Sequence, residues 1–104
     1  MDTLTQTLPL RDEILAKLRE SSGYVEKEFK AHIDGIFGSI ARGEERADSD
    51  LDVLVTFGEK ASLLDLCGLG DYLEDMFGRK VDVVPRRVLR KEIAPYVFRD
   101  LIPI

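Results

Sequence analysis

The most constraining feature of the sequence is a Gly-Ser pair that is followed, ten residues later, by two aspartates at the start of an apolar segment. Asp50 and Asp52 flank the first residue of the segment Leu51 to Phe57, which we expect to be a strand. Side chains alternate along a strand, so both carboxylates project from the same side. They repel each other unless a cation lies between them, and Mg²⁺ commonly binds one or two carboxylates together with substrate phosphate oxygens. The sequence therefore predicts a metal site at this strand start.

The Gly-Ser pair itself predicts a phosphate-binding turn. Gly38 can adopt backbone angles that other residues avoid, and Ser39 can open a short helix whose free N–H groups point at an anion. The segment 32–37 is expected to be the strand that leads into this turn, and Gly43 is expected to end the helical turn 39–42. Phosphates bound here could share a metal ion with the downstream carboxylates.

A third carboxylate, Asp82, interrupts an apolar run that otherwise indicates a buried strand. A buried charge without a partner is costly. If this strand lies beside the strand 51–57, the three acids converge and can hold one or two ions. The alternative is an acid on an edge strand that simply faces water.

Two polar residues between the turn and the acids have open roles. Arg42 could bind a nucleotide phosphate or brace the loop through Glu44 or Asp48, because a guanidinium offers several donors in a fixed fork. Ser49 could cap the turn through its hydroxyl or contact phosphate.

The remaining elements predict an α/β (α+β) fold with a small mixed sheet flanked by helices. We expect a helix from Pro9 to about Glu20, broken at residues 21–23 and resumed over 24–30. Ser62 and Asp65 indicate a helix start, and Gly78 its end. The other expected elements are a strand over 79–84, a helix over 86–92 and a helical turn from Pro95. The apolar tail over 101–104 is expected to dock somewhere, either on the domain's own core or elsewhere.

Length and composition indicate one domain spanning residues 1–104, with residues 1–7 as a flexible N-terminal tail that has no secretory signal pattern. The net charge of −5 argues against direct nucleic-acid binding. The one cysteine, Cys67, is compatible with a reducing cytoplasm, where we expect the protein to reside. No apolar run is long enough to cross a bilayer.

The spacing Gly38-Ser39, ten residues, then Asp50-Leu51-Asp52 resembles the signature of the DNA polymerase beta-like nucleotidyltransferase superfamily. The surrounding residues are similar to the minimal nucleotidyltransferase (MNT) proteins of bacteria and archaea, from Leu8 to the C-terminus. Glu45 and Ala47 stand where many of those proteins carry a small residue and a proline, a departure that affects the loop and not the acids.

The resemblance implies the polymerase beta-like nucleotidyltransferase fold and an enzyme that transfers AMP from ATP to a hydroxyl with two Mg²⁺ ions. It assigns catalysis and metal binding to Asp50, Asp52 and Asp82, the last also as proton acceptor. It assigns nucleotide binding to Gly38, Ser39, Arg42 and Ser49. Many MNT proteins are antitoxins paired with a HEPN-domain toxin, on which they modify a tyrosine. The alternatives are an antitoxin that acts by tight binding without catalysis, and a transferase for a small-molecule hydroxyl.

Overall fold

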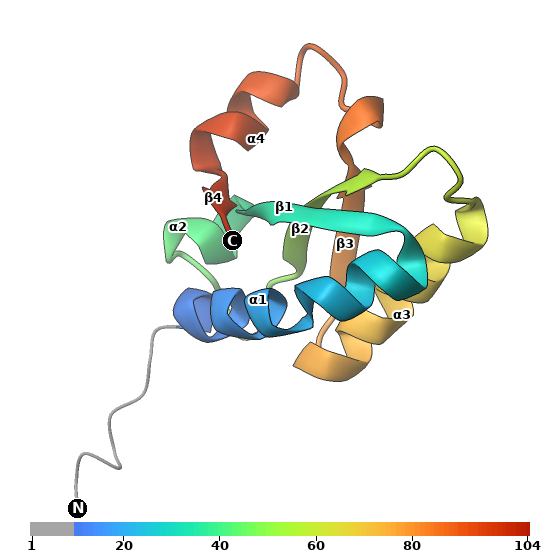
Figure 1. Ribbon diagram of the computed structural model, residues 1–104. Coiled ribbons are helices and arrows are strands. Elements are labelled where there is room, and N and C mark those ends of the chain that lie inside the picture. Colours follow the sequence, from blue (N-terminus) through green and yellow to red (C-terminus); the bar gives the residue numbers. More distant parts are fainter. Residues whose placement is uncertain (1–9) are drawn as a thin grey trace, which may run out of the picture.

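The computed structural model describes residues 10–104 as a four-stranded mixed sheet with helices on both faces (Figure 1). The strand order is β3-β2-β1-β4; β2 is antiparallel to β1 and parallel to β3, and β4 is antiparallel to β1. The strands are β1 (Ala31–Phe37), β2 (Leu51–Phe57), β3 (Val81–Pro85) and β4 (Ile102–Pro103). The helices are α1 (Leu10–Phe29), α2 (Gly38–Arg42), α3 (Leu63–Phe77), the 3-10 turn η2 (Arg86–Val88) and α4 (Ala94–Asp100). The predicted fold class is confirmed.

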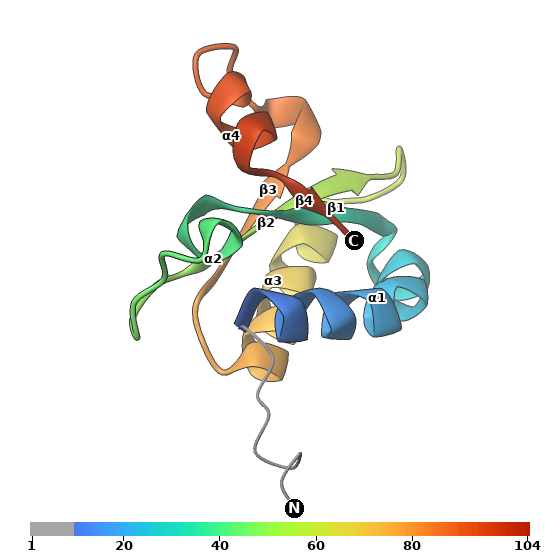
Figure 2. The same cartoon turned by 90° about the vertical axis from the view of Figure 1, so that its left-hand side faces the viewer.

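The hydrophobic core lies between the sheet and the helices α1 and α3, while α4 lies on the opposite face (Figure 2). Leu51, Val53 and Val55 of β2 are buried and alternate along the strand, so they share the face that α1 and α3 cover. Asp52 and Thr56 take the other face of β2. Within residues 10–104, no helix has the length and apolar character needed to cross a membrane.

The first helix is continuous, and the predicted break at residues 21–23 is wrong. Leu18, Ser21 and Val25 are buried on one stripe of α1, so packing against the core holds the helix through the unfavourable Ser-Ser-Gly sequence. The Ser21 hydroxyl donates to the carbonyl of Leu18 at 3.2 Å, which satisfies this buried polar group. Pro9 and the expected tail 1–7 lie outside the described residues.

The predicted helix over 86–92 is also wrong, since only η2 forms before turns lead into α4. Arg86 donates to Asp34 of β1 at 3.1 Å, and its guanidinium lies 5.0 Å from the centre of the Phe98 ring. Thr56 of β2 donates to the same Asp34 carboxylate at 2.7 Å. These contacts hold η2 and α4 on the open face of the sheet. Pro95 lies in the first turn of α4, as expected.

The apolar tail packs on its own domain, which is one of the two alternatives that the sequence left open. Ile102 and Pro103 form β4 and pair with Ile36 and Gly35 of β1. A Cβ atom at Gly35 would overlap the backbone of Ile102, so only glycine allows the two strands to approach this closely.

We expect Gly35→Ala to lower the free energy of unfolding by about 2–3 kcal/mol, because the new methyl group must displace backbone atoms of β4. Urea unfolding would measure the change. Gly23→Ala is the matched control, since nothing lies within 4 Å of its added Cβ, and this change within α1 should stabilise the protein by about 0.5–1 kcal/mol. Equal stabilities of the two variants would contradict the close approach.

Candidate active site

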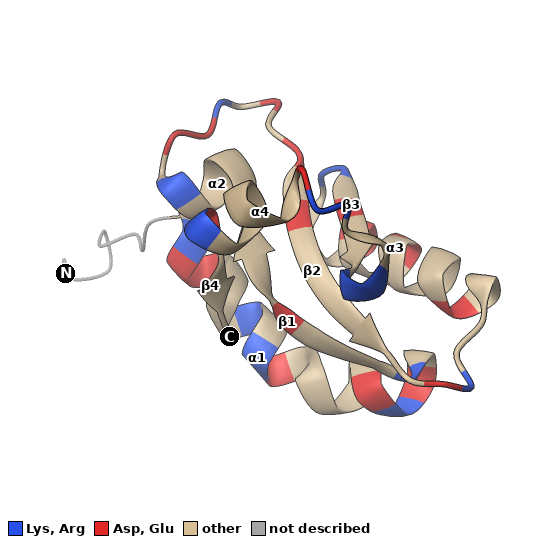
Figure 3. Ribbon diagram, turned by 90° about the horizontal axis from the view of Figure 1, so that it is seen from above, with Lys and Arg blue, Asp and Glu red and all other residues tan. Residues whose placement is uncertain are grey.

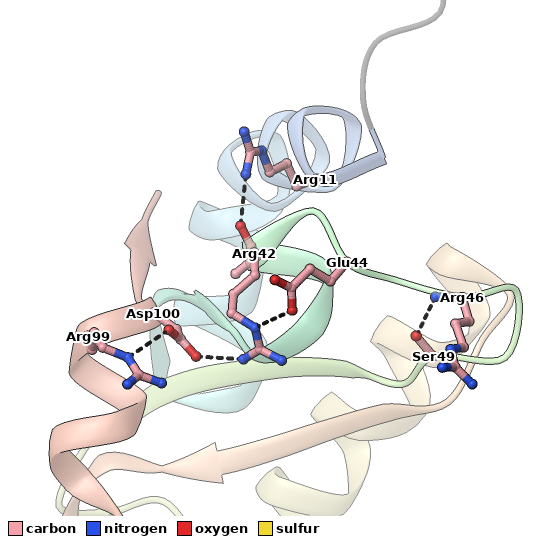
Figure 4. Close-up of polar contacts among 8 residues, drawn as sticks. Arg11, Arg42, Glu44, Arg46, Ser49, Arg99 and Asp100 are labelled. Carbon is pink, nitrogen blue, oxygen red and sulfur yellow. Dashed lines mark hydrogen bonds and ion pairs between the residues drawn. The ribbon is translucent and has the colours of Figure 1, made fainter.

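Gly38 and Ser39 follow β1 as the first two residues of α2, and Gly38 lies directly against Asp52. Gly38 has a φ of 81°, a conformation that favours glycine, and a Cβ atom added there would overlap a carboxylate oxygen of Asp52. The helix α2 ends at Gly43, as predicted. Arg11 of α1 donates to the carbonyl of Ala41 at 3.0 Å, which fixes the end of this short helix (Figure 4). The Gly38 turn and the Asp52 carboxylate therefore lie in direct contact in one site.

Asp52 and Asp82 are register partners in the adjacent parallel strands β2 and β3. Asp52 is partly buried, whereas Asp82 and Asp50 are exposed. The pKa of Asp52 is raised to about 6, mainly by burial and in addition by the negative charges of Asp82 and Asp50, while Arg42 opposes the shift. The structure thus brings the three predicted acids to the same end of the sheet. β3 is an edge strand and Asp82 is exposed on it, which is compatible both with a ligand role and with an acid that faces water.

The carboxylates suit a hard divalent cation in their chemistry. A partly buried acid beside two like charges is destabilised, and a bound Mg²⁺ would relieve that repulsion. Within residues 10–104, no group of three His, Cys, Asp or Glu side chains is spaced to hold a metal ion. The assignment of Asp50, Asp52 and Asp82 as metal ligands stays a prediction.

Arg42 braces the loop in the structure. It donates to Glu44 at 2.9 Å and to Asp100 of α4 at 2.7 Å, and Arg99 donates to the same Asp100 at 3.3 Å (Figure 4). These bonds raise the pKa of Arg42 and lower that of Asp100. The bracing through Glu44 is confirmed, and the contact with phosphate stays a prediction. Asp100 was not foreseen, because nothing in the local sequence links residues 58 positions apart.

Ser49 caps the turn that precedes β2. The backbone N–H of Arg46 donates to its hydroxyl at 2.7 Å, and Arg79 donates to its carbonyl at 2.9 Å. These bonds fix the loop that delivers the chain to Asp50. The capping role is confirmed, and a role of Ser49 in binding phosphate stays a prediction, as it does for Gly38 and Ser39.

A pocket of about 300 Å³ opens beside Asp82 on the face of the sheet that carries α4. Its wall is mostly apolar, and among the described residues 10–104 Asp82 is the one carboxylate that lines it. The lining residues are Phe37, Asp82, Val84, Val88, Leu89, Arg90, Ile93 and Val97. Half of them come from the segment 88–93, whose course depends on the Arg86–Asp34 ion pair, so sequence patterns alone did not reveal this pocket.

The fold and the site together define a nucleotidyltransferase, an enzyme class in which acids beside a glycine turn act on a nucleotide. Residues 12–102 match the nucleotidyltransferase domain family, and the chain belongs to that family. It is 38% identical over 91 residues to the protein adenylyltransferase MntA of Thermococcus cleftensis, covering 88% of this chain and 92% of that protein. It is 36% identical over 89 residues to a candidate protein adenylyltransferase of Methanocaldococcus jannaschii, covering 86% and 88%.

Two solved structures share this fold. One, described as a candidate minimal nucleotidyltransferase, has a TM-score of 0.75 and 41% sequence identity and covers 88% of this chain and 94% of its own. The other, a crystal structure of a toxin–antitoxin with AMP-PNP, has a TM-score of 0.61 and 21% identity, covering 86% of this chain and 67% of that chain. The minimal nucleotidyltransferase structure supports the single-domain fold that the sequence predicts. The toxin–antitoxin structure shows a likeness of fold alone.

Proposed function

We propose that this protein transfers AMP from ATP to a hydroxyl of a partner protein, most simply a tyrosine of a HEPN-domain toxin, and thereby acts as an antitoxin in the cytoplasm. The observation that carries the proposal is the register pairing of Asp52 with Asp82 beside the Gly38 turn. The names of its relatives as protein adenylyltransferases support the class of acceptor. The fold shared with a toxin–antitoxin structure is consistent with such a partner.

In the proposed reaction, the nucleotide binds on one side of the site and the acceptor hydroxyl on the other. Backbone N–H groups of the Gly38–Ser39 turn and the guanidinium of Arg42 would hold the triphosphate, on the side of α2. The acceptor hydroxyl would enter at Asp82, which accepts its proton as the oxygen attacks the α-phosphorus and the bond to pyrophosphate breaks. Two bound Mg²⁺ ions on Asp50, Asp52 and Asp82 would lower the hydroxyl pKa and neutralise the leaving oxygen.

The pocket beside Asp82 favours an aromatic acceptor. A tyrosine has an apolar ring and a polar tip, and the pocket pairs an apolar wall with a carboxylate. Its volume of about 300 Å³ is small for a drug-sized ligand and sufficient for one side chain. The positioning of a hydroxyl next to the phosphate is itself a large part of such catalysis.

Intact-mass spectrometry of the partner toxin tests the proposal directly. The toxin would be incubated with this protein, ATP and Mg²⁺, and we expect mass increments of AMP units, which peptide mapping would place on a tyrosine. The same reaction with Asp52→Asn should leave the toxin unmodified. A stable complex with no increment would overturn the catalytic proposal and favour inhibition by tight binding. Transfer only to small hydroxyl compounds would instead indicate the small-molecule alternative.

A further inference from the structure

The segment 86–91, part of which lines the pocket, carries four cations, and they divide into two kinds. Arg86 is engaged by Asp34 and lies against Phe98, so it serves the fold. Arg87, Arg90 and Lys91 are exposed, and among residues 10–104 none of them forms an ion pair. We call these three residues the basic rim. The basic rim is positively charged, whereas the whole chain has a net charge of −5, so the rim forms a local surface of opposite charge.

The basic rim reaches the acceptor side through Arg90, whereas Arg87 lines a second pocket together with Phe57 and Pro85. Arg90 lines the pocket itself, and the neighbouring Val88 and Ile93 are 61% and 51% exposed although they form its wall. Figure 3 views the molecule from the α4 face, on which blue segments mark η2, which follows the end of β3, and the turn after it. An exposed apolar wall bordered by unpaired charge is the composition of a protein-binding surface.

The charge of the rim defines its partner. We propose that Arg87, Arg90 and Lys91 bind an acidic segment of the acceptor protein that flanks the target hydroxyl, while Val88 and Ile93 contact its apolar residues. The inference rests on the proposed function in placing the acceptor at Asp82. In the proposed function the triphosphate binds at the Gly38 turn at the start of α2, whereas the rim follows β3 in the chain. The rim thus serves as a specificity surface that selects the sequence around the acceptor.

Peptide binding tests this inference independently of turnover. Three fluorescent peptides would carry a central tyrosine flanked by glutamates, by lysines or by glycines. Their anisotropy would be measured with the full chain in the presence of Mg²⁺ and a non-hydrolysable ATP analogue. We expect the acidic peptide to bind about tenfold more tightly than the basic one, and this ratio to fall as salt rises.

Charge reversal supplies the decisive comparison. The double variant R90E/K91E should reverse the order of the peptides, so that the basic peptide binds about tenfold more tightly than the acidic one. The matched control is Lys27→Glu, an exposed residue of α1 on the opposite face of the sheet, which should leave the preference unchanged. A preference unaffected by the double variant, or equally affected by the control, would overturn the inference.

The same variants separate this inference from the proposed function. Charge-dependent peptide binding without AMP transfer to the acidic peptide would uphold the rim and reject the transferase proposal. Transfer at equal rates to all three peptides would uphold the transferase and reject the rim. If the double variant changes the KM for ATP and leaves the peptide KM unchanged, the rim binds nucleotide phosphates and the inference is wrong.

Discussion

Asp52→Asn is expected to reduce AMP transfer strongly while making the protein more stable at pH 7.5. Transfer should fall by about 10²–10³-fold, the cost of removing one group that stabilises charge in a transition state. The pKa of Asp52 is raised to about 6, so its ionised form is unfavourable in the folded protein. Because the side chain is only partly buried, solvent screening reduces the gain from removing this charge to about 1–2 kcal/mol of unfolding free energy.

The pH dependence of this gain has a definite sign. The folded-state pKa lies above the ordinary value of 3.8, so the folded state binds more protons between about pH 4 and 6, and the wild-type protein loses stability as pH rises through that range. The difference between Asp52→Asn and wild type should vanish below about pH 4 and be complete above about pH 7. Urea unfolding across this range would measure it.

A matched variant distinguishes the site from general surface charge. Asp71→Asn removes an exposed carboxylate of α3 and should change neither transfer nor stability by more than about 0.5 kcal/mol. Wild-type transfer by Asp52→Asn would reject the site assignment. Equal stability of wild type and Asp52→Asn at pH 7.5 would show that burial does not destabilise the ionised carboxylate.

Gly38→Ala should reduce transfer by about 10²-fold at a stability cost of only about 1–2 kcal/mol. The alanine must adopt a left-handed φ, and its methyl group must move the Asp52 carboxylate, which is the free end of a side chain and can rotate away. The fold therefore survives while the acid loses its position. A coupled assay of pyrophosphate release and thermal unfolding of the same sample would measure both effects.

Gly70→Ala is the control for this prediction, because its added Cβ meets nothing within 4 Å in the middle of α3. This variant should retain full transfer and gain up to about 1 kcal/mol of stability. Full transfer by Gly38→Ala would show that the turn does not position Asp52.

Local signals in the sequence predicted the parts of the fold that depend on neighbouring residues. The strand 51–57 was predicted with the bounds that β2 has, and Gly43 and Gly78 end α2 and α3 as expected. At the start of α3, the backbone N–H of Ser62 donates to the Asp65 carboxylate at 2.9 Å, which confirms the predicted cap. Each of these features is decided within a few residues of the chain.

The errors arose where distant residues decide the structure. Burial of Leu18 and Val25 keeps α1 helical past Gly23, although propensity favours a break. The Arg86–Asp34 ion pair joins residues far apart in the sequence, as does the pairing of Ile102 with Ile36, which decides between the two alternatives for the tail. In the candidate site, the convergence of the acids could be anticipated from strand alternation. Asp100 and the apolar pocket could not, because they depend on where α4 lies.

Because Asp52 pairs with Asp82, the proposed transfer reaction requires the correct register of β3 against β2. Their Cα atoms sit on neighbouring strands, so the sheet repeat of about 4.8 Å fixes their separation, with no loop conformation involved. A slip of β3 by one residue would turn Asp82 toward the covered face and present a valine in its place. A molecule with that slip would keep its helices and lose its site entirely. Specific activity therefore reports the fraction of molecules with correct sheet pairing, which circular dichroism cannot distinguish.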